Sequence, residues 1–431
     1  MKYLYLIPVT LILLGIGELY YQKKSKAVTS TKDYNTYLTI TANPNLDRIQ
    51  KENLFWKEKF QKSPNQTSYL LTLAGTHTQW FEATGDVHQL LKADSLLTIA
   101  NVRTKYKKSG WLRAQARNYI SQHRFAEAQE LLCNAEVLGE KKRDTQKMLF
   151  DVCLELGNDT EAYAYLEEIS KKSDFDYAIR LSKWNDHTGD LTEAIRILEQ
   201  TLPYVETSSD GLKLWTYSNL ADYYGHAGLI NKSYAYYLKA LAINPQYTYA
   251  LKGIAWIVFS KEQNSQEALR ILDAIEQTYS SPDLFLLKAE IAEFEGKTEY
   301  KNDQIQKYTD YTQSRPYGAM YNKYDVLLQA ENESTYEDAI TLAQEEIEHR
   351  PTVQSYDLLA WAYYRSGQIE KAFHIASTQV VGQTTEPEVL YHLAHILKAS
   401  NQQEKVDLLK EELLASSYEL GPVASATIQQ L

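Results

Sequence analysis

Two histidines have the spacing that a helix needs to present a pair of metal ligands. His392 and His395 lie three residues apart, and His374 stands in the segment before them. Side chains at positions i and i+3 share one helix face, so both imidazoles could bind the same Zn²⁺ ion. Zinc sites use three or four protein ligands, however, and two histidines leave the set incomplete. We therefore predict no metal site.

The segment 184–187 places an acid and a base side by side, directly before the turn at 188–190. Asp186 and His187 in such a position more often cap a helix than take part in catalysis. The sequence contains no phosphate-binding loop and no GxSxG, HExxH or CxxC motif. We therefore predict that the protein is not an enzyme and binds no cofactor.

The two cysteines, Cys133 and Cys153, lie on what we expect to be consecutive helices. The simplest interpretation is a pair of thiols in the protein core. A disulfide remains an alternative if the protein is exported, because oxidising compartments allow such bonds.

The stretch from Leu214 to Pro245 indicates which elements position the side chains. Leu220, Ala221 and Tyr224 recur at the spacing of one helix face, and Gly228 stands where that helix should end. The second half of the stretch continues the pattern with Ser233, Tyr237, Ala240 and Leu241. The stretch therefore predicts two antiparallel helices. Such a hairpin cannot bury its apolar face alone, so it needs neighbours of the same kind.

The helix position that Ala221 occupies recurs along the chain at a fixed interval of 34 residues, in most cases with another alanine. The matching pairs and triplets are Ala221, Ala255 and Ala289, then Ala360 and Ala394, and Ala116 and Phe150. A constant period of this length is the signature of a solenoid. We count about ten repeats between residues 68 and 416, with no alternating apolar runs that would indicate strands.

These offsets resemble those of the tetratricopeptide repeat (TPR) family over most of the chain. The short apolar N-terminus and the lack of a catalytic motif look like the exported TPR proteins of Bacteroidota. The resemblance implies an all-α protein, a right-handed superhelical solenoid of about ten TPR helix hairpins. It also implies that the first helix of each repeat lines a concave groove that binds peptides or partner proteins. Asn219 and Lys252 are residue types of the carboxylate-clamp variant, but the full clamp set is not reproduced.

The TPR phase places one set of side chains on the groove. They are Arg113, Arg117, Lys147, Arg180 and Lys183 in the early repeats, Trp215, Asn219, Tyr249, Lys252 and Trp256 in the middle, and Trp361, Tyr364, Tyr391, His392 and His395 in the late repeats. Exposed aromatic rings on a partly basic surface are typical of binding anchors, and would suit an acidic and apolar partner segment. The alternative is that these rings pack on neighbouring helices.

The N-terminus carries the only membrane-like segment, residues 3–21, directly after Met1 and Lys2. Its strongly apolar part is short for a membrane span and resembles the core of a secretory signal. The lysines that follow favour a cytoplasmic body under the positive-inside rule, but we favour export. We expect a signal peptide or N-terminal membrane anchor over 1–26, a polar tether and capping helix over 27–67, the solenoid over 68–416, and a C-terminal tail over 417–431.

The net charge of −11 argues against a general nucleic-acid binder. The charge is uneven, because residues 95–126 contain seven cations and no acidic residue, whereas residues 331–350 contain seven acidic residues and a single arginine. A solvated helix face explains either run equally well. We expect a scaffold that binds a partner protein or peptide at the cell envelope, with membrane contact only through the N-terminus. The alternatives are an accessory subunit of an envelope enzyme or transporter, or a solenoid that binds a small molecule.

Overall fold

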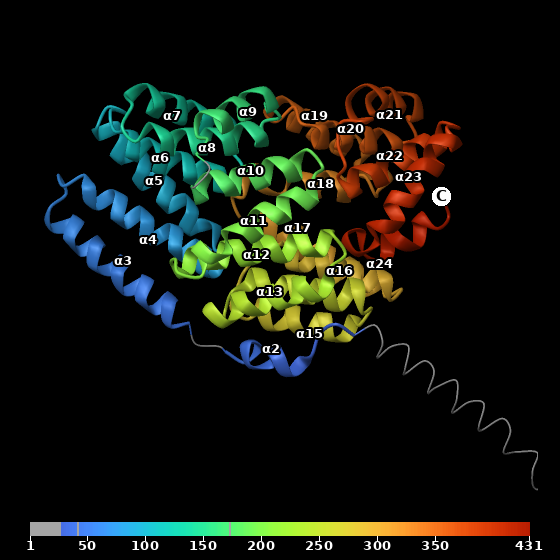
Figure 1. Cartoon of the computed structure of the whole chain (residues 1–431), viewed down its shortest axis with the longest axis horizontal. Helices are drawn as coiled ribbons and strands as arrows, with labels where there is room; N and C mark the ends of the chain where they lie inside the picture. The colour runs from blue at the N-terminus through green and yellow to red at the C-terminus, as the bar shows by residue number, and fades with distance from the viewer. Residues whose placement is uncertain (1–26, 41–42, 172–173) are drawn as a thin grey trace, which may run out of the picture.

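The computed structural model describes residues 27–40, 43–171 and 174–431. Within these residues the chain forms α-helices and short 3-10 and π segments, and it forms no strand. Figure 1 shows the helices stacked side by side as a coiled solenoid. The prediction of an all-α superhelical repeat fold is therefore confirmed.

In the described part of the chain, ten helix hairpins follow one another. The first five are α4 (Ser68–Thr84) with α5 (Val87–Arg103), α6 (Ser109–Ser121) with α7 (Phe125–Leu138), α8 (Lys142–Glu155) with α9 (Asp159–Glu168), α10 (Phe175–His187) with α11 (Leu191–Val205), and α12 (Asp210–His226) with α13 (Ile230–Ile243). The last five are α14 (Thr248–Trp256) with α15 (Ser265–Glu276), α16 (Asp283–Phe294) with α17 (Thr298–Gln313), α18 (Asn322–Gln329) with α19 (Tyr336–His349), α20 (Val353–Arg365) with α21 (Ile369–Ile375), and α22 (Pro387–Ala399) with α23 (Gln403–Ala415).

The small residues that set the repeat phase lie where the helices cross. Ala221, Ala255, Ala360 and Ala394 are fully buried. A methyl group at these positions lets two helices approach closely, and the larger apolar side chains beside it fill the space between hairpins. The interval of 34 residues therefore reflects the need for a small side chain where the helices of each repeat cross.

One repeat contains an extra residue between Ala255 and Ala268, and the backbone absorbs it locally. Helix α14 continues into a π-helical segment, η1 (Ile257–Lys261), in which the wider turn takes up the additional residue. A second π segment, η4 (Ala376–Val380), extends α21 in the same way. The hairpins on either side keep their packing.

Loops of early hairpins touch loops of late hairpins, so the solenoid winds back on itself. The backbone N–H of Ser280 donates to the carbonyl of Thr84 at 2.8 Å. Further along, the guanidinium of Arg350 lies 3.8 Å from the carboxylate of Glu155. These contacts join segments that are nearly two hundred residues apart, and they enclose the concave face between the two halves of the solenoid.

The N-terminal described residues differ from the polar tether that the sequence predicts. Helix α2 (Thr31–Leu38) docks against α13 and α15 through Tyr34, which is fully buried and donates to Glu267 at 2.7 Å. The backbone N–H groups of Val28 and Thr29 donate to the Glu262 carboxylate at 2.8 and 2.6 Å. One buried aromatic ring and a shared carboxylate thus hold a segment that is polar in composition.

Helix α3 (Pro44–Lys62) then packs along α4 at the start of the solenoid. None of the described helices is long and apolar enough to cross a membrane. Residues 1–26, on which the prediction of a signal or anchor rests, lie outside the described part of the chain.

The C-terminal residues also differ from the expected tail. Residues 417–431 contain helix α24 (Ser417–Ile428), which bends at Gly421. This helix leaves the last hairpin and crosses to α12, η1, α16 and α22. It therefore lies over the concave face instead of extending the solenoid (Figure 1).

Candidate partner-binding groove

The middle of the concave face holds the start of α24. The indole Nε1 of Trp256 donates to the backbone carbonyl of Tyr418 at 3.1 Å, and the hydroxyl of Ser260 donates to the same oxygen at 2.6 Å. Gly421 has a φ of +77°, and a Cβ there would stand 2.9 Å from the Trp256 ring and 2.6 Å from the Glu290 carboxylate. Only glycine permits this backbone to rest so closely on the groove.

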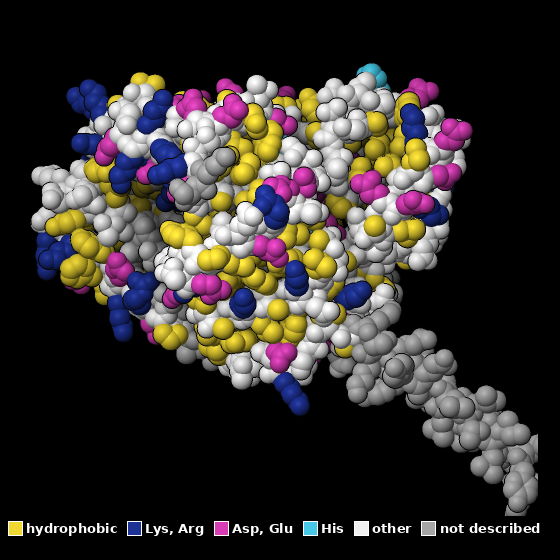
Figure 2. Space-filling model, viewed as in Figure 1, with side chains coloured by type: hydrophobic (Ala, Val, Ile, Leu, Met, Phe, Trp, Pro, Cys, Tyr) yellow, Lys and Arg dark blue, Asp and Glu magenta, His cyan; other side chains and the backbone are white. Residues whose placement is uncertain are grey.

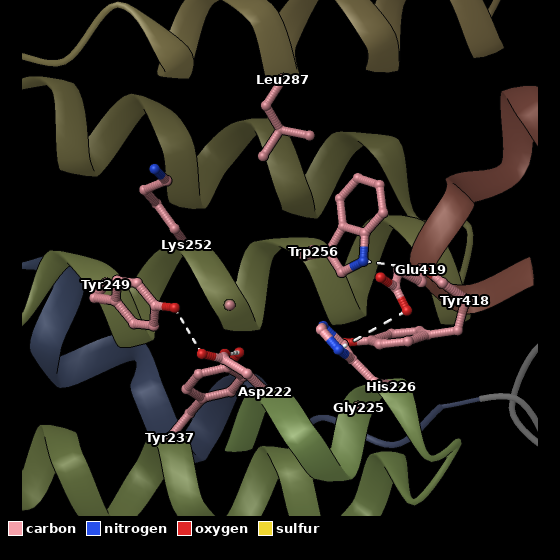
Figure 3. Close-up of a pocket in the computed structure, with 11 residues that line it drawn as sticks. Asp222, Gly225, His226, Tyr237, Tyr249, Lys252, Trp256, Leu287, Tyr418 and Glu419 are labelled. Atoms are coloured by element: carbon pink, nitrogen blue, oxygen red, sulfur yellow. Dashed lines mark hydrogen bonds and ion pairs between the residues drawn. The ribbon is translucent and has the colours of Figure 1, made fainter. Parts of the chain in front are cut away.

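A pocket of about 410 Å³ lies between α12, α14 and α24. Figure 3 shows side chains from the three helices pointing into it. Predicted groove residues Tyr249, Lys252 and Trp256 line it together with Tyr418 and Glu419 of α24. The pocket volume lies in the usual range for ligand sites, about 300–1,000 Å³.

The floor of this pocket is a carboxylate held by two phenols. Tyr237 donates to one oxygen of Asp222 at 2.5 Å, and Tyr249 donates to the other at 2.6 Å (Figure 3). Burial raises the pKa of Asp222, and the two hydrogen bonds act in the opposite direction. Tyr237 reaches this position because Gly253 has no side chain, since a Cβ there would overlap the ring.

Lys252 lies on the wall of the pocket and forms an ion pair with Asp283 of α16. Burial lowers the pKa of Lys252 to about 8, whereas the Asp283 carboxylate favours the charged amine. With a pKa of about 8, the amine is still mostly protonated at neutral pH. The ammonium is thus bound to a carboxylate of the neighbouring repeat and not free for a ligand.

The cations of the early repeats are paired in the same way. Lys147 of α8 pairs with Asp176 of α10, and Arg180 of α10 pairs with Asp151 of α8 at 2.6 Å. These pairs cross between successive first helices, the helices that line the groove. They stabilise the wall and neutralise its charge.

The remaining early cations are divided between paired and open positions. Lys183 lies 3.6 Å from Glu155, and Arg113 donates to the carbonyl of Glu140 at 2.8 Å. Arg117 is exposed. The basic character that the sequence gives the early groove is therefore mostly cancelled by carboxylates from the adjacent helix.

The late aromatic residues pack on one another. The Trp361 ring stacks on His392 with centroids 4.1 Å apart, and both side chains are buried, at 8% and 5% exposure. Tyr391 contacts His395 edge-on at 4.6 Å, and Tyr364 lies 5.0 Å from Trp361. At this end of the groove the predicted aromatic residues therefore pack on neighbouring helices, which is the alternative to a role as exposed binding anchors.

The two late histidines have different partners. His392 shares a hydrogen bond of 2.7 Å with the buried carboxylate of Asp357. Burial lowers the pKa of His395 to about 4, and the nearby charges of His392, Lys398 and Arg365 add to this effect. Among the described residues, no group of three or more His, Cys, Asp or Glu side chains could hold a metal ion.

The middle aromatic residues Trp215 and Tyr249 remain accessible, at 38% and 50% exposure. Both line a second hollow of about 590 Å³, between α3 and α4 on one side and α12 with the α13–α14 turn on the other. Asn219 donates to the carbonyl of Trp215 on its own helix at 2.7 Å. The accessible part of the groove is therefore its aromatic middle.

Sequence reasoning missed the contribution of the C-terminus to this site. Tyr418 and Glu419 belong to a segment whose only local signal is the helix stop at Gly421 and Pro422. Nothing in their immediate neighbours indicates that they fold back onto α12 and α14. The cysteines are both free, with Cys153 buried and Cys133 exposed, so only one of them is a core thiol.

No family model matches the chain, and no curated protein matches it. Its structure is similar to human IFIT1 in a dimer with m7Gppp-AAAA, at 13% identity over 77% of this chain and 75% of that one, with a TM-score of 0.48. It is also similar to the APC/C hetero-tetramer Cut9-Hcn1, at 13% identity over 93% and 99% of the two chains and a TM-score of 0.34. The TPR protein YrrB, described as having an unusual peptide-binding site, matches 46% of this chain and 95% of its own at 17% identity, with a TM-score of 0.27. Similarity this low supports no inference about what the chain binds.

Proposed function

We propose that this chain is a non-catalytic scaffold that binds a segment of a partner protein in its concave groove. The proposal rests on the way in which the start of α24 is bound in the groove. The groove side chains Trp256 and Ser260 hold a backbone carbonyl, and the Tyr418 ring lines the pocket beside them. Backbone hydrogen bonds combined with a pocket for a side chain are what a groove needs to bind a peptide.

The charges that face the groove favour a basic and apolar partner segment. Burial and, to a lesser extent, the nearby carboxylates of Glu293 and Glu388 raise the pKa of Glu290 to about 8. Burial also raises the pKa of Glu419. Glu293 pairs with Lys301 and Glu388 pairs with Lys323. Glu290 is therefore a groove carboxylate whose charged form a cation from a partner would stabilise. The acidic partner expected from the sequence has less support, because Lys147, Arg180, Lys183 and Lys252 already meet carboxylates and only Arg113 and Arg117 do not.

The proposed location is the cell envelope, outside the cytoplasm. It is supported by the sequence pattern of residues 3–21 alone, a lysine followed by a short apolar run. A reporter fused after residue 40 should be active outside the cytoplasm. Activity only in the cytoplasm would contradict the location without affecting the groove proposal.

Site-specific crosslinking in the native host tests the groove proposal. A photo-crosslinking residue at Tyr249, which is half exposed in the groove, should trap one discrete partner. The matched control is Tyr204, which is 58% exposed on the second helix of its hairpin, α11, and should not trap that protein. Trapping of the same partner at both positions would place the contact outside the groove.

The purified partner then gives an affinity. Trp256→Ala should raise its Kd by roughly 30-fold or more, because buried aromatic anchors contribute about 2 kcal/mol or more to binding. Tyr204→Ala should leave the Kd within about twofold. A thermal melt of each variant checks that the fold is intact, and an unchanged Kd for a folded Trp256→Ala would refute the proposal.

A further inference from the structure

The turn between α5 and α6 presents four cations to solvent. We define the basic corner as Val102, Arg103 and residues 105–108, which include Lys105, Tyr106, Lys107 and Lys108. All six side chains are exposed. The corner lies inside the run of residues 95–126 that contains no acidic residue. In Figure 2 lysine and arginine side chains are densest on the left, the side where α3 and α6 lie in Figure 1.

The backbone of the corner is held in an unusual conformation. Lys105 and Tyr106 are consecutive non-glycine residues with left-handed φ angles of 53° and 56°. The Tyr106 N–H donates to the carbonyl of Asn101 at 2.9 Å, and the buried Asn101 amide donates to Gln115 of α6 at 2.8 Å. Left-handed residues with a side chain are disfavoured, so they persist where their surroundings fix them.

The corner also exposes apolar groups between its cations. Val102 is 57% exposed and Tyr106 is 42% exposed, and Ile99 continues this face one turn earlier on α5. Burying such side chains in the core would stabilise the fold. Here they stand in solvent beside Arg103 and the three lysines.

The end of α3 extends this surface. The Arg103 guanidinium lies over the Phe60 ring at 5.7 Å and donates to the carbonyl of Pro64 at 2.6 Å. The last turn of α3 adds Lys59 and Lys62, both exposed. Two further apolar side chains, Leu54 and Phe55, are exposed on the same helix.

The corner lysines differ from those of the groove in their partners. Within residues 27–40, 43–171 and 174–431, no carboxylate lies within ion-pair distance of Lys105, Lys107 or Lys108. The chain as a whole carries a net charge of −11, so this positive region is a local feature. Its charge is available to an anionic surface.

We propose that the basic corner docks on an anionic lipid surface, with its cations among the phosphates and its apolar side chains in the headgroup layer. Each Lys or Arg near such a surface contributes about 1 kcal/mol, which is roughly a fivefold gain in partitioning. Exposed aliphatic groups beside the cations favour a lipid over a nucleic acid, whose phosphate backbone offers them no apolar layer. This membrane contact is separate from the groove, and it adds a second contact to the one that the sequence assigns to the N-terminus alone.

Vesicle binding by the full chain tests the charge requirement. Binding to phosphatidylglycerol vesicles should exceed binding to phosphatidylcholine vesicles and should weaken with salt. The triple variant Lys105→Gln, Lys107→Gln, Lys108→Gln should lower the partition coefficient on phosphatidylglycerol by roughly 100-fold. The control Lys32→Gln, Lys261→Gln, Lys405→Gln removes the same charge from other exposed positions and should stay within about threefold of wild type.

A fluorescent probe shows which part of the full chain touches the lipid, even if another segment holds the protein on the vesicle. In a Cys133→Ser background, an environment-sensitive dye on Tyr106→Cys should shift to the blue with phosphatidylglycerol vesicles. The same dye on Leu408→Cys, an exposed position on α23 far along the solenoid, should not shift.

Three outcomes would overturn the proposal. The first is equal binding of both triple variants to phosphatidylglycerol, and the second is an unshifted dye at residue 106. The third is a triple variant that loses binding to a single-stranded RNA oligonucleotide while its vesicle binding is unchanged, which would assign the corner to nucleic acid.

Discussion

The groove and the basic corner both carry lysine and arginine, but the structure uses them differently. In the groove, Lys147 and Arg180 each meet a carboxylate from an adjacent first helix. At the corner, Lys105 and its neighbours meet no carboxylate in the part of the chain that the structure describes. A stacked repeat brings the next helix within reach of each cation, whereas a projecting turn has solvent on its outer side. The same residue type therefore stabilises the wall in one region and is free to bind in the other.

The largest difference should appear when a methyl group is added to each region. Gly253→Ala in the groove should lower the free energy of unfolding by about 1–3 kcal/mol, because the new Cβ overlaps the Tyr237 ring. Gly110→Ala at the start of α6 meets only the flexible Arg113 guanidinium, at 3.6 Å, and should be neutral or stabilise by up to about 1 kcal/mol. Chemical denaturation measures both. Similar losses for the two variants would break the comparison.

The next effect concerns pH and the late end of the groove. The folded pKa of His395 is about 4, below its usual value near 6.5, so between these values the unfolded chain binds a proton that the folded chain does not. Stability from this group is complete above pH 6.5 and is lost as the pH falls toward 4. The full shift corresponds to about 3 kcal/mol, and because the ring is only partly buried we expect a loss of roughly 2 kcal/mol across this window. His395→Phe should flatten the stability profile between pH 7 and 4.5, and an identical slope would show that His395 does not contribute.

A smaller effect tests the ion pairs of the wall directly. Asp151→Asn should cost about 1 kcal/mol, because the half-buried Arg180 loses its carboxylate. A double-mutant cycle with Arg180→Gln should give a coupling energy of similar size. Lys105→Gln at the corner serves as the control and should change stability by less than about 0.5 kcal/mol. Zero coupling between Asp151 and Arg180 would mean that the wall pairs are incidental.

The smallest effect sharpens the functional side of the comparison. The triple glutamine variant of Lys105, Lys107 and Lys108 should melt within about 1–2 °C of wild type, because these lysines stabilise no described neighbour. Its melting temperature by circular dichroism is the measurement. A drop of several degrees would show that the corner is part of the fold, and any loss of vesicle binding would then need a structural explanation.

The local part of the fold was predictable from the sequence. Ala221 and the small residues spaced at 34 from it lie at buried crossings, and the ten hairpins span residues 68–415. The extra residue between Ala255 and Ala268 lengthens one repeat, and only the structure shows that a π segment absorbs it. For the site, Trp215, Tyr249 and Trp256 lie on the first helices α12 and α14, and their role in binding stays a prediction. The charge of the groove was not predictable, since a sequence shows each cation but not the carboxylate that faces it across the stack.

By itself the sequence determined the helices, their hairpins and the period of the stack. These depend on residues within one repeat, because helix formation and hairpin packing use neighbours that are close along the chain. Only the tertiary structure decided that Tyr34 docks on α15, that Tyr418 reaches Trp256 across 162 positions, and that early loops meet late ones. Such contacts depend on the superhelical turn, which accumulates from small rotations between successive repeats. The total rotation cannot be read from any one repeat, so the enclosed groove forms only when all ten hairpins are stacked.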